Sequence, residues 1–303
     1  MAAASSSPDA CRFDAATTCA EAQAAMKRAF IAAGIDTPDL DARLLLCGLL
    51  DLDAAKLITA PLHPLGDGAA AVSAAAGRRI AHEPVSRILG RRDFYGRRFE
   101  VTPATLDPRP DTETVVDAVL GYVDNNGGRQ RPWRLLDVGT GTGCLLIKLL
   151  AELPFATGVG SDISAAALAV AERNAKLLHV EDRADWRLAD GLDGLTGRFD
   201  IIVSNPPYIP SAQISALAPE VRAYDPHLAL DGGADGLDFY RRFAGEIVDL
   251  ISEGYIVFEI GYDQAEAVSD LLAGRGRDLG WPVPTVISDL AGNARSVAQT
   301  ARR

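Results

Sequence analysis

The segment Asn205-Pro206-Pro207-Tyr208 follows directly on an apolar stretch, residues 199–204, that has the character of a strand. A planar NH2 group is a poor nucleophile because its lone pair is delocalised into the neighbouring π system. A site that activates it should accept both N–H hydrogens, and the Asn205 side-chain oxygen and the Pro206 carbonyl offer two acceptors. The two prolines restrict φ and bring no competing N–H, while Tyr208 supplies a flat packing face. We therefore predict catalytic roles for Asn205, Pro206 and Tyr208, and substrate binding by all four residues.

A strand-ending turn is the competing interpretation of these four residues, since Asn-Pro is an ordinary turn signal. The segment alone does not separate the two interpretations. The choice depends on what the rest of the chain could bring to the same place.

A glycine-rich loop, Asp137 to Gly143, lies between a predicted strand and the helix after it, where glycine lets the backbone approach a ligand. The dinucleotide fingerprint G-x-G-x-x-G would need glycine at position 144, which is Cys144, and the phosphate-binding sequence Gly-Lys-Ser/Thr is absent. The loop is thus suited to a small ligand pressed against main chain. The cofactor-binding residues that we predict in it are Asp137, Gly139, Thr140, Gly141, Thr142 and Gly143.

Two further carboxylates follow the next predicted strands. Asp162 stands about twenty residues after the loop, where an acid can accept both hydroxyls of a ribose. Its alternative role as a helix cap is better filled by Ser164, which is closer to the helix start. Asp190 and Gly191 end the third strand, near the expected place of an adenine ring. Ribose and adenine without pyrophosphate favour S-adenosylmethionine over NAD, and Asn205 could also touch its methionine end.

From residue 134 onward the predicted strands and helices alternate. This alternation indicates an α/β fold with an open, mostly parallel sheet and helices on both faces, closed by antiparallel edge strands near residues 284–298. We expect strands near residues 135–138, 157–162, 185–189, 199–204 and 255–260, and a helix over residues 236–251. Ligands of such sheets bind outside the carboxyl ends of the strands.

The part of the chain before this alternation is predicted to be mainly helical. Residues 1–16 are expected to be disordered, residues 17–82 to form a small helical domain, residues 83–112 a hairpin linker, and residues 113–303 the catalytic domain. Thr37-Pro38 predicts a capped helix start, followed by Leu40, Leu44, Leu45 and Leu49 facing the core. The helical domain holds no cluster with catalytic potential, so we expect it to serve recognition.

Composition excludes several classes of protein. The 303 residues carry a net charge of −11, which argues against a general nucleic-acid binder with a basic surface. The four cysteines show neither metal-ligand spacing nor a paired framework, so we expect no metal and a reducing compartment. No apolar run approaches the roughly 20 residues needed to span a bilayer. We therefore expect a cytoplasmic protein with no membrane partner.

Taken together, the motifs make the chain similar to the bacterial peptide chain release factor glutamine methyltransferases. The resemblance runs from about Asp41 to the C-terminus. It rests on residues 83–90 (EPVSRILG), 94–96 (FYG), 108–113 (PRPDTE), 137–143, 205–208, 235–240 (DGLDFY) and 258–261 (FEIG). Residues 293–296 depart from the Asp-Arg pair usual in the family, Asp225-Pro226 stands for a usual Glu-Pro, and Gly191 replaces an aromatic residue of some members.

The resemblance implies a Rossmann-like methyltransferase fold and methyl transfer from S-adenosylmethionine to a glutamine side-chain amide nitrogen. It implies as substrate the Gly-Gly-Gln motif of class I release factors, with no direct nucleic-acid partner. Three alternatives stay open: an amino methyltransferase acting on a flipped base, a paralogue acting on a ribosomal protein glutamine, and an inactive cofactor-binding scaffold. Arg109, Thr112 and Glu113 either close the cofactor side of the pocket or form a structural linker capping the next helix.

Overall fold

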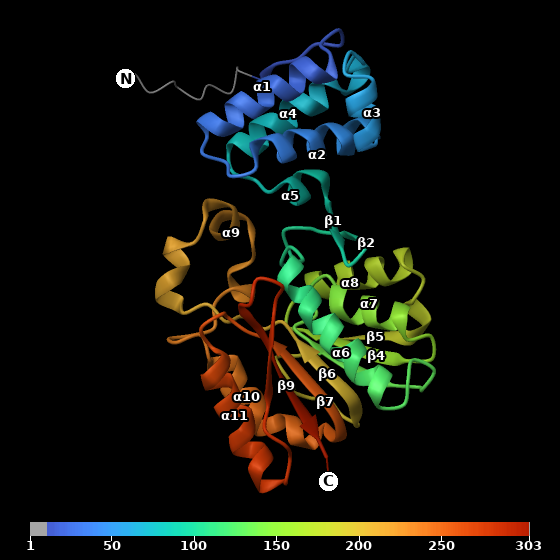
Figure 1. Ribbon diagram of the computed structural model, residues 1–303, viewed down its shortest axis with the longest axis vertical. Helices are drawn as coiled ribbons and strands as arrows, with labels where there is room; N and C mark the ends of the chain where they lie inside the picture. The colour runs from blue at the N-terminus through green and yellow to red at the C-terminus, as the bar shows by residue number, and fades with distance from the viewer. Residues whose placement is uncertain (1–10, 303) are drawn as a thin grey trace. The chain divides into compact units, whose positions relative to one another are not determined.

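The computed structural model describes residues 11–302, and the chain divides into two compact units (Figure 1). One unit comprises the chain up to Gly90 together with Ala218–Tyr224, and the other comprises Arg91–Leu217 and Asp225 onward. The disorder predicted for residues 1–16 falls mostly outside the described residues. Within them, Cys11 is buried in the core of the first unit, so that part of the prediction is wrong.

The first unit is helical. Its helices are α1 (Cys19–Ala32), α2 (Pro38–Leu50), α3 (Ala54–Thr59), α4 (Ala69–Ile80) and α5 (Val85–Leu89), joined by the distant segment α9 (Pro219–Tyr224). Helix α1 begins with a capping box, in which the Thr18 hydroxyl and the Glu21 carboxylate each accept a backbone N–H of the other residue. Helix α2 begins at Pro38 as predicted, but Thr37 does not cap it. The Thr37 hydroxyl donates instead to Asp41 at 2.9 Å.

The buried face of α2 differs from the predicted one. Leu45 is fully buried, but Leu40 and Leu44 are each 44% exposed, and Ala42 and Leu46 fill the core in their place. The reason lies in a buried ion pair between α2 and α4. Asp41 accepts from the Arg79 guanidinium of α4 at 2.7 Å, so the side of α2 that carries Asp41 faces α4.

The second unit contains a seven-stranded sheet in the order β5-β4-β3-β6-β7-β9-β8. Strands β3 (Arg134–Val138), β4 (Thr157–Asp162), β5 (Ala184–Leu188), β6 (Phe199–Ser204) and β7 (Ile251–Glu259) pair in parallel. Strands β8 (Thr285–Ser288) and β9 (Ala294–Ala301) are antiparallel, as predicted. Because β3 neighbours both β4 and β6, the strand order reverses at β3, where open α/β sheets bind ligands.

Helices cover both faces of the sheet, as predicted. Helices α6 (Glu113–Asn125), α7 (Cys144–Glu152) and α8 (Ala165–Leu177) contribute to one buried cluster. Helices α10 (Asp238–Glu246) and α11 (Ala265–Asp278) lie on the other face, as Figure 1 shows. They contribute to a second buried cluster there. The helix predicted over residues 236–251 is shorter, because a 3-10 turn at Ile247–Asp249 leads into β7, which starts at Ile251 and pairs with β6 through a bulge.

The hairpin predicted in the linker is present as β1 (Arg91–Phe94) and β2 (Arg97–Glu100), which pair antiparallel. Within the described residues, no helix combines the length and the apolar character required to cross a bilayer.

Candidate active site

A cavity of about 540 Å³ opens at the carboxyl ends of the parallel strands, within the second unit. Most of the predicted site residues line it, which brings together loops that are far apart in the chain. The predicted residues found in its wall are Asp137, Gly139, Thr140, Gly141, Thr142, Asp162, Asp190, Gly191, Asn205 and Pro207. Gly143, Pro206 and Tyr208 are not among the residues that line it in the described part of the chain.

The glycine-rich loop turns tightly between β3 and α7. Gly139 and Gly141 have φ of +69° and +55°, a left-handed conformation that suits glycine, and neither would meet another atom if it carried a Cβ. Gly143 has a different surrounding, since a Cβ there would press on Ile147 and Trp186. The first two glycines therefore keep main chain open to a ligand, whereas Gly143 lets the loop pack against its own domain.

Asp137 fixes the glycine-rich loop through a buried hydrogen bond. Its carboxylate is 1% exposed and accepts from the Thr140 hydroxyl at 2.6 Å. Burial raises the pKa of Asp137 to about 7, and the Thr140 hydrogen bond counteracts part of that rise.

Asp162 is fixed at the end of β4 by two backbone donors. One carboxylate oxygen accepts from the Gly141 N–H and the other from the Ser164 N–H, both at 2.9 Å. Ser164 itself caps α8 by accepting from the Ala167 N–H, so Asp162 is not needed as a cap, as the sequence predicts. Burial raises the pKa of Asp162. The carboxylate is held rigidly in the cavity wall, beside the glycine loop.

Asp190 and Gly191 also line the cavity, and an arginine that the sequence did not single out holds them. Arg242 of α10 donates to the Asp190 carboxylate at 2.8 Å and to the Asp190 carbonyl at 2.7 Å. A Cβ at Gly191 would meet the same guanidinium at 3.2 Å. Because 52 residues separate the partners, sequence spacing gave no signal of this contact.

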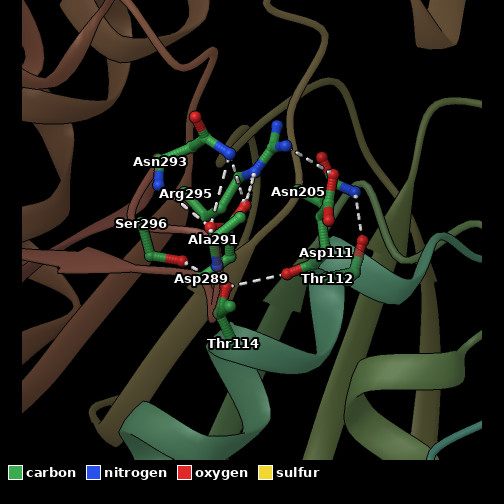
Figure 2. Close-up of polar contacts among 9 residues, drawn as sticks. All are labelled: Asp111, Thr112, Thr114, Asn205, Asp289, Ala291, Asn293, Arg295 and Ser296. Carbon is green, nitrogen blue, oxygen red and sulfur yellow. Dashed lines mark hydrogen bonds and ion pairs between the residues drawn. The ribbon is translucent and has the colours of Figure 1, made fainter.

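Asn205 is held by its nitrogen. Its Nδ2 donates to the Thr112 hydroxyl oxygen at 3.1 Å, a contact across 93 residues that Figure 2 shows. Because one N–H of the amide is bound to Thr112, the side chain is held in place and its oxygen remains an acceptor for a ligand in the cavity. Pro206 is buried beside it and Pro207 lines the wall.

Tyr208 is held through both its carbonyl and its ring. Its carbonyl accepts from the Gln264 side chain at 2.9 Å, and its ring packs against the buried cluster on the α10 and α11 face. Burial raises the pKa of Tyr208, so the phenol stays neutral over the ordinary pH range.

The loop before α6 has mixed roles. Arg109 lines the cavity and pairs with the buried carboxylate of Asp225 at 2.6 Å. Thr112 also lines the cavity. Although it stands at the start of α6, its side chain makes no capping hydrogen bond. Glu113 points elsewhere and accepts from the Tyr95 N–H at 2.7 Å, which ties the β1–β2 turn to α6. Of the three residues, two therefore belong to the cavity and Glu113 is structural.

Comparison with known proteins gives concordant results in both halves of the chain. The family described as "PrmC N-terminal domain" matches residues 21–90, and the family described as "Methyltransferase small domain" matches residues 123–221. The "Release factor glutamine methyltransferase" of Rhodospirillum rubrum is 45% identical over 273 residues, 89% of this chain and 81% of that protein. The protein of the same description from Bradyrhizobium diazoefficiens is 44% identical, over 88% of this chain and 89% of its own length.

A solved structure shares the fold alone. The hMettl16 catalytic domain in complex with the MAT2A 3'UTR hairpin 6 superposes with a TM-score of 0.52 at 15% identity, covering 67% of this chain and 74% of that one.

Proposed function

This chain belongs to the release factor glutamine methyltransferase family, and from that premise we propose that it methylates the side-chain amide nitrogen of a glutamine in class I peptide chain release factors. The glutamine is that of the Gly-Gly-Gln motif, and the methyl donor is S-adenosylmethionine. One observation carries the proposal beyond the family match. Asn205, an amide whose nitrogen is already bonded, lies in the same cavity wall as the glycine loop and Asp162.

The cavity suits this methyl donor. Gly139 and Gly141 expose main chain where a ligand can approach closely, and the fixed Asp162 carboxylate can accept from two ribose hydroxyls. The apolar side chains of Leu145, Ile163 and Phe239 in the wall suit the contact with an uncharged base. When bound, S-adenosylmethionine supplies an electrophilic methyl group on a sulfonium centre.

The chain's own residues act on the glutamine amide. The Asn205 Oδ1 and the Pro206 carbonyl accept its two N–H hydrogens and so aim the nitrogen lone pair along the axis of transfer. The nitrogen lone pair forms the new C–N bond while the electron pair of the broken C–S bond stays on sulfur. Positive charge develops on nitrogen, where the two acceptors stabilise it, and one N–H proton then leaves to water. Tyr208 packs behind this segment and keeps its backbone in place.

The helical unit is proposed to recognise the release factor, because every residue that lines the cavity belongs to the other unit. Since release factors work in translation termination, we place the reaction in the cytoplasm.

A transfer assay with labelled S-adenosylmethionine tests the proposal, with a release factor, ribosomes and bulk nucleic acid offered separately. We expect label on the factor alone, at the glutamine, as located by mass spectrometry of its peptides. Asn205→Ala should lower the single-turnover rate by roughly a hundredfold, as expected when one preorganised partner of the transition state is lost. Label on ribosomal protein or nucleic acid but not on the factor would reject the proposed substrate. A rate within a few-fold of wild type in Asn205→Ala would reject the role of that amide.

A further inference from the structure

The two ends of the Asn205 side chain have nearly the same shape but opposite hydrogen-bonding character. One end is an acceptor and the other carries two donors. A turn of the amide by half a revolution would leave packing almost unchanged, yet it would present N–H groups to the NH2 group of the substrate. Whatever fixes the orientation of this amide therefore decides whether the site can accept the substrate's hydrogens.

Thr112 is the residue that touches the amide nitrogen. Its oxygen receives the Asn205 N–H at 3.1 Å, and its side chain is 2% exposed, so water does not compete for the contact. A hydroxyl alone does not choose the orientation, because it can donate or accept. A second partner must take the hydroxyl proton before the oxygen can act only as an acceptor toward Asn205.

Glu259 provides that partner. It ends β7, is 2% exposed, and lies close enough to Thr112 for that side chain to lower its pKa. Burial acts in the opposite direction and raises the pKa of Glu259 to about 7, with Arg295 and Arg109 opposing the rise. Because the Thr112 side chain favours the ionised form of Glu259, the hydroxyl proton is directed to that carboxylate, which leaves a Thr112 lone pair for Asn205.

The turn that carries Thr112 is itself clamped, as Figure 2 shows. Arg295 of β9 pairs with Asp111, the residue before Thr112, at 3.1 Å and with Asp289 at 2.8 Å. On the other side of Thr112, the Glu113 carboxylate accepts from the Tyr95 N–H at 2.7 Å. The main chain around Thr112 is thus fixed at both ends, which leaves the hydroxyl at a defined place between Glu259 and Asn205.

A capping role does not account for the buried hydroxyl. Thr112 occupies the N-cap position of α6, yet its side chain bonds none of the free N–H groups of that helix. Its contacts are Asn205 on one side and Glu259 on the other.

We propose that Thr112 is a positioning residue that orients the Asn205 amide, so that Oδ1 and not Nδ2 faces the substrate amino group. The inference rests on the proposed function, in which Asn205 accepts an N–H hydrogen of the glutamine. Thr112 does not react; it acts through Asn205, with Glu259 setting the direction of its hydroxyl.

Thr112→Val and Thr112→Ser separate this role from packing. Valine keeps the branched shape and removes the hydroxyl, whereas serine keeps the hydroxyl and removes the methyl group. Measured by single-turnover transfer to a full-length release factor at saturating S-adenosylmethionine, the rate should fall by about ten- to a hundredfold in Thr112→Val. Thr112→Ser should stay within about fivefold of wild type, because the hydrogen-bonding chain is preserved. Calorimetric affinity for S-adenosylmethionine should change by less than about threefold in both.

Thr114→Val is the matched control. It removes a hydroxyl two residues further along, whose partners are the Asp111 carbonyl and Ser296, and it should keep the rate within about threefold of wild type. Thermal unfolding of each variant reports whether the fold is intact.

Three results would overturn the inference. A wild-type rate in Thr112→Val would show that the hydroxyl is not needed. Equal losses in the valine and serine variants would assign the effect to packing. A loss of S-adenosylmethionine affinity without a loss of rate at saturation would make Thr112 a cofactor contact. If wild type methylated another acceptor instead of the release factor, the proposed function would fail. Comparing Thr112→Val and Thr112→Ser on that acceptor would still test the role of Thr112, since any planar amino group needs the acceptor oxygen.

Discussion

Asp162 shows how much one residue of this site does at once. Its two oxygens hold the Gly141 and Ser164 N–H groups, and the same carboxylate faces the cavity in which the ribose would lie. Replacing it with alanine removes a charge-assisted acceptor and frees the glycine loop. We expect Asp162→Ala to weaken S-adenosylmethionine binding by about 1.5–3 kcal/mol, measured by calorimetric titration.

The control for that measurement is Asp185→Ala, which removes an exposed carboxylate near the start of β5, outside the cavity wall. Its affinity for S-adenosylmethionine should match that of wild type. Unchanged affinity in Asp162→Ala would remove this carboxylate from the cofactor site.

For individual residues, the sequence allowed us to predict the site residues that follow strands, but not the side chains that hold them in place. Asp162 and Asn205 stand directly after or at the end of apolar strands, so the geometry of a parallel sheet brings them to one edge. Arg242 and Thr112 reach their partners across 52 and 93 residues. No local pattern encodes such a pairing, because it depends on how α10 and the loop before α6 pack after the sheet has formed.

At the scale of elements, the backbone of the Asn205–Tyr208 segment is held by close main-chain packing. Gly236 has φ of +78°, and a Cβ at that position would overlap the Tyr208 carbonyl oxygen. The Gln264 side-chain nitrogen donates to the carbonyls of both residues, at 2.9 Å to Tyr208 and at 3.2 Å to Gly236. Since the obstacle is backbone, it cannot move aside like the end of a flexible side chain.

Gly236→Ala should therefore destabilise the protein by about 1–3 kcal/mol, through a strained φ and a displaced Tyr208, and lower the transfer rate with it. Denaturant unfolding and single-turnover transfer measure the two effects. Gly121→Ala is the control with the opposite sign: Gly121 lies exposed inside α6 with no atom near its absent Cβ, so alanine should stabilise by about 0.5–1 kcal/mol. A fully stable and active Gly236→Ala would mean that the segment tolerates a shift of Tyr208.

The order of strands and helices in the second unit was predictable from the sequence, because hydrophobic period and turn residues alternate along residues 134–260. The bounds of α10 and β7 were not. Gly254 suggests a break in the strand, yet β7 continues through it from Ile251, because the bulge opposite β6 accommodates the glycine. In α2 the leucine spacing gave the wrong face, since a buried Asp41 takes a position that apolar periodicity would give to leucine.

At the scale of the whole molecule, the division into units does not follow the order of the chain. Helix α9 lies eleven residues after Tyr208 in sequence, yet it belongs to the helical unit. There Arg79 binds both Asp41 and Glu220, and the Tyr224 hydroxyl donates to the Ala81 carbonyl at 2.8 Å. The sequence predicted a helical domain ending near residue 82 and gave no sign of this later segment, because six residues carry too little periodicity to assign to a core.

The helical unit should govern recognition of the protein substrate and leave the chemistry unaffected. It has its own buried core, and the cavity is lined entirely by residues of the other unit. A glutamine within a folded factor needs more contact area than the cavity offers, since specific protein interfaces bury roughly 800 Å² per partner. Deleting residues 1–90 should thus preserve S-adenosylmethionine affinity while raising the KM for a full-length release factor by about tenfold or more.

A short Gly-Gly-Gln peptide is the internal control, because it makes no contacts beyond the cavity and its slow methylation should change little on deletion. Arg79→Met in the full chain provides a second route, since it leaves Asp41 buried without its cation and should destabilise the helical unit by about 3–5 kcal/mol. Near the unfolding temperature of that unit, Arg79→Met should therefore lose factor methylation while peptide methylation persists. Equal losses on factor and peptide in both variants would instead show that the helical unit stabilises the catalytic fold, and recognition would then have to lie in the second unit.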